Sequence, residues 1–287
     1  MAENQYGFPT EVLSLPSLGL LYPEDSPLRS GTIDVKYMTA KEEDILTSQN
    51  LIQQGKVIDK LLESVIANRK IKTHELLVGD KNALMVGTRI LGYGKDYRAE
   101  IRDPDTQEIV ELNVDLTKLK HKKIDKKLYK AGNRFSYTLP NSKRVVEFKL
   151  LTQQDENEIQ KMLDDYVKVE KLTGVSNELT TRFKHYILSI DGETEQHIID
   201  KFVDNEFLAL DTRALRKYVS DITPDIELKF DYTSQTGNLH TIDVPLGIEF
   251  FLASRRVIGR PYTKNSSTSP TMVMGSITTN STICQFL

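Results

Sequence analysis

The side chains that could carry acid–base or metal chemistry are few and far apart in this sequence. His197 stands close to Glu193 and Glu195, which could supply a metal ligand or a general base beside a carboxylate. The chain has five histidines, and no two of them have the i, i+4 spacing by which helices bind zinc. We therefore interpret His197 as a surface histidine on a helix.

Adjacent carboxylates are the second candidates for acid–base work. Asp164 and Asp165 form one pair and Glu42 and Glu43 another, but neighbouring side chains on a helix diverge. Helix capping and solvation explain both pairs. The sequence also lacks a Gly-x4-Gly-Lys-Ser/Thr phosphate loop, a Gly-x-Gly-x-x-Gly motif and a nucleophile elbow. We predict a protein that is not an enzyme and uses no cofactor.

The composition is typical of a globular protein with a sizeable core. Of 287 residues, 39% are hydrophobic and 28% are charged, and the length favours two modest domains over one large domain. No apolar run approaches the roughly 20 residues that cross a bilayer, and the first residues lack the pattern of a signal peptide. The single cysteine, Cys284, excludes internal disulfides and thiolate zinc cages. We expect a cytosolic protein without a membrane or small-molecule partner.

Residues 118–130 form the one strongly basic segment of the chain. They contain seven lysines and His121 against a single acid, Asp125, whereas the whole chain has a net charge of −3. Charge runs usually mark solvated segments, so a lysine-rich linker is the first interpretation. A nonspecific contact with nucleic-acid phosphates and a contact with an acidic protein are the alternatives.

The order of the expected elements repeats along the chain. Residues 33–43 align without gaps with residues 146–156, and each segment alternates apolar and polar residues as a half-buried strand does. Each segment contains a threonine, Thr39 or Thr152, that is followed three residues later by an acid. This spacing predicts a capping box at the start of a long helix.

The similarity continues downstream of these helices. Asp80 and Asp211 begin matching segments, and we expect each of them to cap the N-terminus of a second helix. A β-hairpin should follow in each copy, with turns at residues 103–106 and 233–237. These matches predict an α+β fold made by tandem duplication of a strand–helix–helix–β-hairpin unit.

A Leu-Pro segment precedes each copy, and the second copy has an insertion with a short helix near residues 195–202. We expect an extended N-terminal segment at 1–30, a first α+β unit at 31–117, a lysine-rich linker at 118–132, a second α+β unit at 133–252 and a Ser/Thr-rich C-terminal tail at 253–287.

The tail differs in composition from both units. Twelve of its 35 residues are serine or threonine and none is acidic. Disorder is the first interpretation. The alternative is that residues 272–274 and 276–279, rich in β-branched side chains, add as a strand to a neighbouring subunit's sheet edge.

Four short motifs occur in order across the two units. They are Leu-Pro-Ser-x-Gly-x-x-Tyr at residues 15–22, Met-Thr-Ala-x-Glu-Glu at 38–43, Leu-x-Gly-Asp-x-Asn-Ala-Leu at 77–84 and Val-Pro-Leu-Gly-Ile-Glu-Phe-Phe at 244–251. Their order and spacing resemble the baseplate hub family of T-even-type contractile-tailed bacteriophages. The resemblance implies a late, non-enzymatic phage tail protein that acts in baseplate hub assembly or structure by protein–protein contacts, as a hub subunit or an assembly chaperone.

The resemblance also concerns the hairpin turns. Some relatives carry Cys-Pro-x-Cys there, which would make the hairpins zinc ribbons. In this chain the turn positions are Asp103 and Thr106 in the first unit and Tyr232 and Gln235 in the second, and none of them supplies a thiolate. The hairpins should therefore resemble metal-free ribbons that are held by cross-strand packing and turn chemistry.

The implied partners are other phage baseplate hub and tail proteins, met in the host cytoplasm during tail assembly or in the virion. We expect two apolar segments to make these contacts, and packing on their own units is the alternative. The expected contact residues are Leu15, Pro16, Leu20, Leu21, Tyr22, Phe250, Phe251, Leu252 and Tyr262. A nucleic-acid-binding adaptor that uses the lysine-rich linker is the alternative function.

Overall fold

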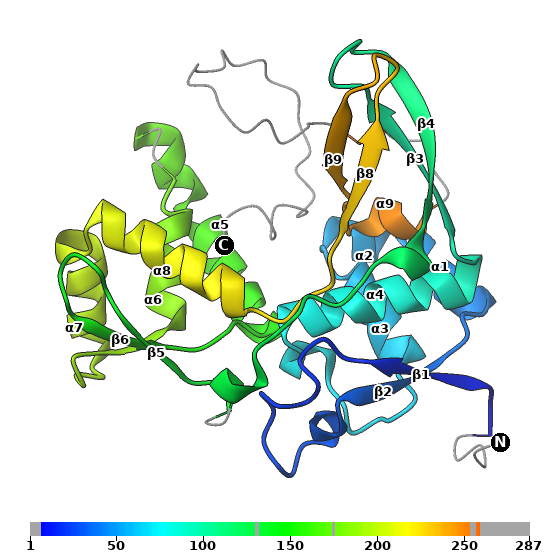
Figure 1. Ribbon diagram of the computed structural model, residues 1–287. Helices are drawn as coiled ribbons and strands as arrows, with labels where there is room; N and C mark the ends of the chain where they lie inside the picture. The colour runs from blue at the N-terminus through cyan, green and yellow to red at the C-terminus, as the bar shows by residue number, and fades with distance from the viewer. Residues whose placement is uncertain (1–6, 130–131, 174–175, 253–256, 259–287) are drawn as a thin grey trace.

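The computed structural model describes residues 7–129, 132–173, 176–252 and 257–258 (Figure 1). Within these residues, helices combine with four small sheets, so the predicted α+β class is confirmed. Figure 1 shows two lobes, one around helix α4 and one around helices α5, α6 and α8. None of the described helices is both long and apolar enough to cross a lipid bilayer.

The first lobe begins with a two-stranded sheet that is followed by four helices. Strands β1 (Thr10–Ser14) and β2 (Thr32–Lys36) pair antiparallel, with Leu13 opposite Ile33. The helices are α1 (Ala40–Thr47), α2 (Gln49–Gln53), α3 (Val57–Val65) and α4 (Val78–Tyr93), with 3-10 turns at Pro27–Ser30 and Thr73–Glu75.

The predicted capping box begins α1. The N–H and Oγ1 of Thr39 both donate to Glu42 Oε2, at 2.8 and 2.6 Å. The single long helix expected after it is wrong, because the chain leaves helical geometry twice. Ser48 is extended between α1 and α2, and Gly55 has a φ of +66° before α3. The apolar spacing continues across both breaks because all three helices pack on one core.

The second lobe combines a three-stranded sheet with longer helices. The antiparallel strands are, in order, β5 (Phe135–Thr138), β6 (Val145–Phe148) and β7 (Ile187–Ile190). The helices are α5 (Gln153–Thr173), α6 (Glu178–Tyr186), α7 (Gln196–Lys201) and α8 (Ala209–Ile222), with a π-helical turn at Phe202–Glu206. A second capping box begins α5, where Thr152 Oγ1 donates to Asp155 Oδ2 at 2.7 Å. Helix α7 lies where the short inserted helix was predicted.

Two β-hairpins stand side by side on the first lobe (Figure 1). Strand β3 (Asp96–Arg102) pairs with β4 (Ile109–Asp115), and β8 (Lys229–Thr233) pairs with β9 (Leu239–Asp243). A small core of Ile101, Tyr232 and Ile242 lies between them. The second hairpin therefore leaves its own lobe and packs on the first.

The chain continues past this second hairpin with two short elements. They are helix α9 (Ile248–Phe251) and strand β10 (Val257–Ile258), and β10 pairs parallel to β3. Residues 272–279, for which strand addition was one expectation, lie outside the described residues.

One hydrophobic core runs through both lobes. It includes the fully buried Leu28 and Leu84 of the first lobe and Phe148 and Leu215 of the second. Because apolar packing is continuous between the lobes, we expect them to unfold together.

The lysine-rich segment is an ordered connection rather than a wholly solvated linker. A 3-10 turn at Leu116–Lys118 leads into it, and a second 3-10 turn at Lys126–Tyr129 lies within it. The Lys122 N–H donates to Asp225 O at 2.8 Å, and the Glu227 N–H donates to Lys120 O at 2.7 Å. The backbone is fixed because it pairs with the segment that leads back to the second hairpin. Several lysine side chains remain exposed, at positions 118, 120, 123, 126 and 127.

Candidate functional site

A buried carboxylate fixes residues 15–22, the lead-in segment of the first lobe. Asp80 is fully buried in the first turn of α4 and accepts Ser17 N–H at 2.9 Å, Ser17 Oγ–H at 2.6 Å and Tyr22 O–H at 2.6 Å. The Tyr22 oxygen accepts the Leu77 N–H at 2.9 Å. Burial raises the pKa of Asp80 in spite of these donors, and burial next to Asp80 raises the pKa of Tyr22.

The second lobe has the corresponding arrangement at α8. Asp211 accepts the N–H and Nδ2–H of Asn141 at 2.8 and 2.9 Å and the N–H of Ser142 at 3.0 Å. The prediction that the two aspartates are N-caps is wrong, because Leu77 and Leu208 occupy the cap positions. Each aspartate is the third helical residue, where it faces the positive end of the helix dipole. It binds the lead-in segment of its own lobe, residues 15–22 for Asp80 and residues 141–142 for Asp211.

Most residues expected to contact partners lie inside the protein. Leu15, Pro16, Leu21, Tyr22, Phe250 and Phe251 are buried, Leu20 and Leu252 are partly buried, and Tyr262 lies outside the described residues. Phe250 packs on Tyr97 with ring centroids 5.1 Å apart, and the Arg89 guanidinium lies 5.3 Å from its ring centre. In this structure the buried side chains of both segments pack in the chain's own core, which is the alternative interpretation.

The four turn positions of the two hairpins meet around one carboxylate. Oδ2 of the buried Asp103 accepts the Tyr232 O–H at 2.7 Å and the Gln235 N–H at 3.3 Å. Oδ1 accepts the N–H groups of Asp105 and Thr106 at 2.8 and 3.1 Å. Burial opposes ionisation of Asp103, but these donors together lower its pKa. The bond to Asp103 raises the pKa of Tyr232 to about 12.

An exposed carboxylate adds to this contact between the hairpin tips. Asp105 Oδ2 accepts hydrogen bonds from Ser234 Oγ, Thr236 Oγ1 and Asn238 Nδ2. Asp105 Oδ1 lies 3.1 Å from His240 Nε2. The hydroxyl donors, the histidine and the amide lower the pKa of Asp105. We name Asp103, Asp105 and their hydrogen-bond donors the tip network.

The tip network does not fit a zinc ion. Structural zinc sites use four thiolate or imidazole ligands, whereas Thr106 and Gln235 direct backbone N–H donors at Asp103. Both carboxylate oxygens of Asp103 are hydrogen-bonded, and Tyr232 donates its proton to one of them. A hydrogen-bonded aspartate therefore joins the tips where the family resemblance would place a metal.

Asp103→Ala is expected to loosen the hairpin tips, because Tyr232 and three backbone N–H groups lose their acceptor. Amide hydrogen exchange at Gln235 should become faster while exchange in α4 stays unchanged. Asp231→Ala is the matched control, since this aspartate is exposed on β8. Unchanged exchange at Gln235 would show that the carboxylate does not hold the tips together.

Acid should open the same contact. Asp103 and Asp105 have lowered pKa values in the folded protein. Their stabilising contribution is therefore present above the usual carboxyl pKa of about 3.9 and is lost as the pH falls through the lower folded values. The protection of the tip amides, relative to an unfolded chain at the same pH, should stay high down to about pH 4 and fall only below it. Opening that begins near neutral pH would contradict this assignment.

A second cluster, Asp155, Glu158 and His185, brings together groups that could ligate a cation. His185 Nε2 lies 3.5 Å from Asp155 Oδ1 and 3.3 Å from Glu158 Oε2. Asp155 Oδ1 also accepts Lys149 Nζ at 2.5 Å, while Oδ2 takes part in the capping box of Thr152. The ammonium competes with any cation for the same oxygen, so we assign this cluster to the start of α5.

The catalytic candidates do not assemble into a site within the described residues. His197 Nδ1 lies 3.2 Å from a Glu195 oxygen, and both side chains are largely exposed. Glu42 is held in its capping box by Thr39, and Ser64 also donates to it. Burial opposes ionisation of Glu42, but these hydrogen bonds lower its pKa to about 2. These contacts are structural.

The two lobes meet where α4 and α5 begin. Leu77 faces Thr152 in an isolated antiparallel bridge. Two backbone hydrogen bonds flank it. The Val78 N–H donates to Leu151 O at 3.3 Å, and the Gln153 N–H donates to Leu76 O at 2.8 Å. This junction was not predicted, because the apolar run before Gly79 carries no signal for its partner.

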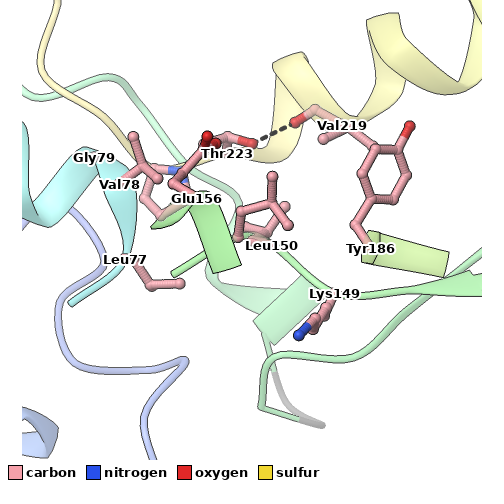
Figure 2. A pocket seen from close by; sticks show the side chains of 11 residues that line it. Leu77, Val78, Gly79, Lys149, Leu150, Glu156, Tyr186, Val219 and Thr223 are labelled. Carbon is pink, nitrogen blue, oxygen red and sulfur yellow. Dashed lines mark hydrogen bonds between the residues drawn. The ribbon is translucent and has the colours of Figure 1, made fainter. Parts of the chain in front are cut away.

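A mainly apolar pocket lies at the same junction (Figure 2). Figure 2 shows Gly79 on one side of the pocket and Tyr186 on the other, with Leu150 between them. The Tyr186 hydroxyl is buried without a hydrogen-bond partner among the described residues, and burial raises its pKa. The Glu156 carboxylate in the wall is paired with Arg182 at 2.8 Å. We assign the pocket to imperfect packing between the lobes.

Comparison with known families identifies the class of this protein. A family model described as "T4 bacteriophage base plate protein" matches residues 22–253, most of the chain. The chain belongs to this family. No curated protein and no solved structure matches this baseplate protein. The family is structural in character, and it implies association with the virion tail and with other baseplate proteins. The expected resemblance to T4-type baseplate proteins is thereby confirmed.

Proposed function

We propose that this baseplate protein acts at the hub, as a hub subunit or an assembly chaperone, through protein–protein contacts and without catalysis. The observation that carries the proposal is the family match over residues 22–253. The ordered motifs between residues 15 and 251 favour the hub among baseplate structures. The structural use of the carboxylates described above favours a role without catalysis. The protein would meet its partners in the host cytoplasm during tail assembly.

The two lobes support the further proposal that the chain arose by tandem duplication. Each copy has a capping box at its first helix. Each also has a buried aspartate, Asp80 or Asp211, that binds the lead-in segment from the first turn of the second helix. The units at 31–117 and 133–252 then differ mainly in the insertion and in the second hairpin, which packs on the first lobe. Two related but non-identical copies give one chain two distinct docking surfaces.

Co-expression with the other hub proteins of the same phage tests the hub role. We expect the full chain to co-purify with at least one of them, and hub formation to require it. The proposal fails if none co-purifies and hubs form equally well without the protein. Mass spectrometry of purified virions then separates the two forms of the role, because a subunit is retained and a chaperone is absent.

A nucleic-acid-binding adaptor is the second candidate, because five lysine side chains of the ordered segment 118–129 are exposed. Mixing the protein with duplex DNA at low and high salt tests it. A phosphate-driven complex weakens steeply as salt rises. Lys126→Glu combined with Lys127→Glu should abolish such a complex, and absence of binding at low salt ends this candidate.

A further inference from the structure

The junction between the lobes has two halves with different sequences. One half is the run that leads into α4, residues 76–79, and the other is the run that leads into α5, residues 150–153. The Val78 N–H donates to Leu151 O, and the Gln153 N–H donates to Leu76 O. Such a contact is heterologous, because the two surfaces that meet are not the same surface.

The second lobe has a segment, residues 207–210, that corresponds to the first half of this junction. Within the described residues, no other segment covers its residues 208–210. Asp80 corresponds to Asp211, so Leu77 corresponds to Leu208 and Gly79 to Leu210. Leu77 is 3% exposed at the junction, whereas Leu208 is 51% exposed and Leu210 is 66% exposed. The intervening Ala209 is also exposed. Three successive apolar residues at the start of α8 therefore face solvent.

The first lobe has a segment, residues 37–40, that corresponds to the other half of the junction and is also largely exposed. Thr39 corresponds to Thr152, so residues 37–40 correspond to residues 150–153. Leu150, Leu151 and Gln153 are buried, whereas Tyr37, Thr39 and Ala40 are exposed. The exposed fraction of Tyr37 is 41%.

The backbone groups that would complete this second junction are free. Within the described residues, no hydrogen bond engages the Ala209 N–H or the Phe207 carbonyl, which correspond to the groups of Val78 and Leu76. The Ala40 N–H and the Met38 carbonyl, which correspond to the groups of Gln153 and Leu151, are free as well. Both surfaces thus offer the donor and the acceptor that the junction uses within the chain.

We propose that residues 207–210 of one copy dock on residues 37–40 of a second copy of this chain, as a continuation of the junction inside the chain. Helices α1 and α7 lie in different lobes, on opposite sides of Figure 1, so copies associate head to tail. A heterologous contact of this kind grows into a ring or a filament. The proposal goes beyond the hub role and does not depend on it.

We expect the contact between copies to be looser than the contact within the chain. A Cβ on Gly79 would lie 1.9 Å from the carbonyl oxygen of Pro224, which follows α8, so the chain requires glycine there, whereas the corresponding Leu210 is exposed. The leucine side chain adds apolar area to the contact instead. We therefore expect association that is reversible and depends on concentration.

Sedimentation of the full chain over a wide concentration range tests the proposal. The wild-type protein should form oligomers as concentration rises, and Leu208→Asp and Leu210→Asp should each shift it to monomers. Leu239→Asp is the matched control, since this leucine is 69% exposed on β9, away from both surfaces, and it should behave as wild type. A wild-type protein that stays monomeric, or oligomers that persist in both α8 variants, overturns the proposal.

Disulfide trapping tests the register of the contact. In a Cys284→Ser background, Leu208→Cys with Thr39→Cys should give disulfide-linked oligomers on oxidation, because the corresponding Leu77 and Thr152 face each other. Leu77→Cys with Thr152→Cys is the reference pair and should cross-link within one chain. Cross-linking by the reference pair alone contradicts the proposed register.

Discussion

Gly79→Ala is expected to destabilise the protein by about 3 kcal/mol, the upper part of the usual range for overpacking. The added Cβ would lie 1.9 Å from the Pro224 carbonyl oxygen and 2.8 Å from Asp225 Cα, and both are backbone atoms that cannot rotate away. The start of α4 and the segment that follows α8 must then shift apart. Chemical denaturation should show the loss as a lower transition midpoint.

Gly92→Ala is the matched control for this variant. Both glycines lie in α4, and alanine is the better helix former at each. A Cβ at Gly92 would meet Met38 Sδ at 2.6 Å, but the methionine side chain is flexible and can move aside. Stability similar to wild type is expected there. If Gly79→Ala unfolds at the same denaturant concentration as Gly92→Ala, the close contact between Gly79 and Pro224 is contradicted.

Asp80→Ala is expected to cost about 3 kcal/mol, because three buried donors lose their acceptor and each contributes on the order of 1 kcal/mol. The donors are the N–H and O–H of Ser17 and the O–H of Tyr22. Asp80→Asn should cost less, since it keeps one acceptor oxygen. The free energy of unfolding measures both.

Asp165→Ala provides the surface comparison for this series, because Asp165 is exposed on α5. A change within about 0.5 kcal/mol is expected there. Equal stabilities for Asp80→Ala and Asp165→Ala would mean that the carboxylate does not hold the lead-in segment. Because burial raises the pKa of Asp80, its ionised form is the costly one, and its contribution to the free energy of unfolding should increase as the pH falls through its folded pKa.

Features that follow from local rules were predictable from the sequence. The capping boxes at Thr39 and Thr152 need only a hydroxyl and an acid three residues apart, and both are present. The two hairpins follow from alternating strands around turn residues. The prediction of one long first helix is wrong for a local reason as well, since Gly55 takes a positive φ that ends helical geometry.

Features that depend on distant partners were not predictable in the same way. Asp103 and Tyr232 are separated by 129 positions, and nothing in either turn indicates that the hairpins meet. The lead-in segment is apolar, which fits a contact surface and a core segment equally. Its position depends on Asp80, for which the sequence predicts only a helix cap. The exposed Leu208 at the start of α8 differs from its buried counterpart Leu77 in its surroundings, and the sequence does not show that difference.

The central claim, a role in the baseplate, is tested most directly by infection with a phage whose gene for this protein is interrupted. We predict that lysates contain no complete baseplates by electron microscopy, and that the full chain supplied in trans restores them. A normal number of complete baseplates in the absence of the protein would contradict the account.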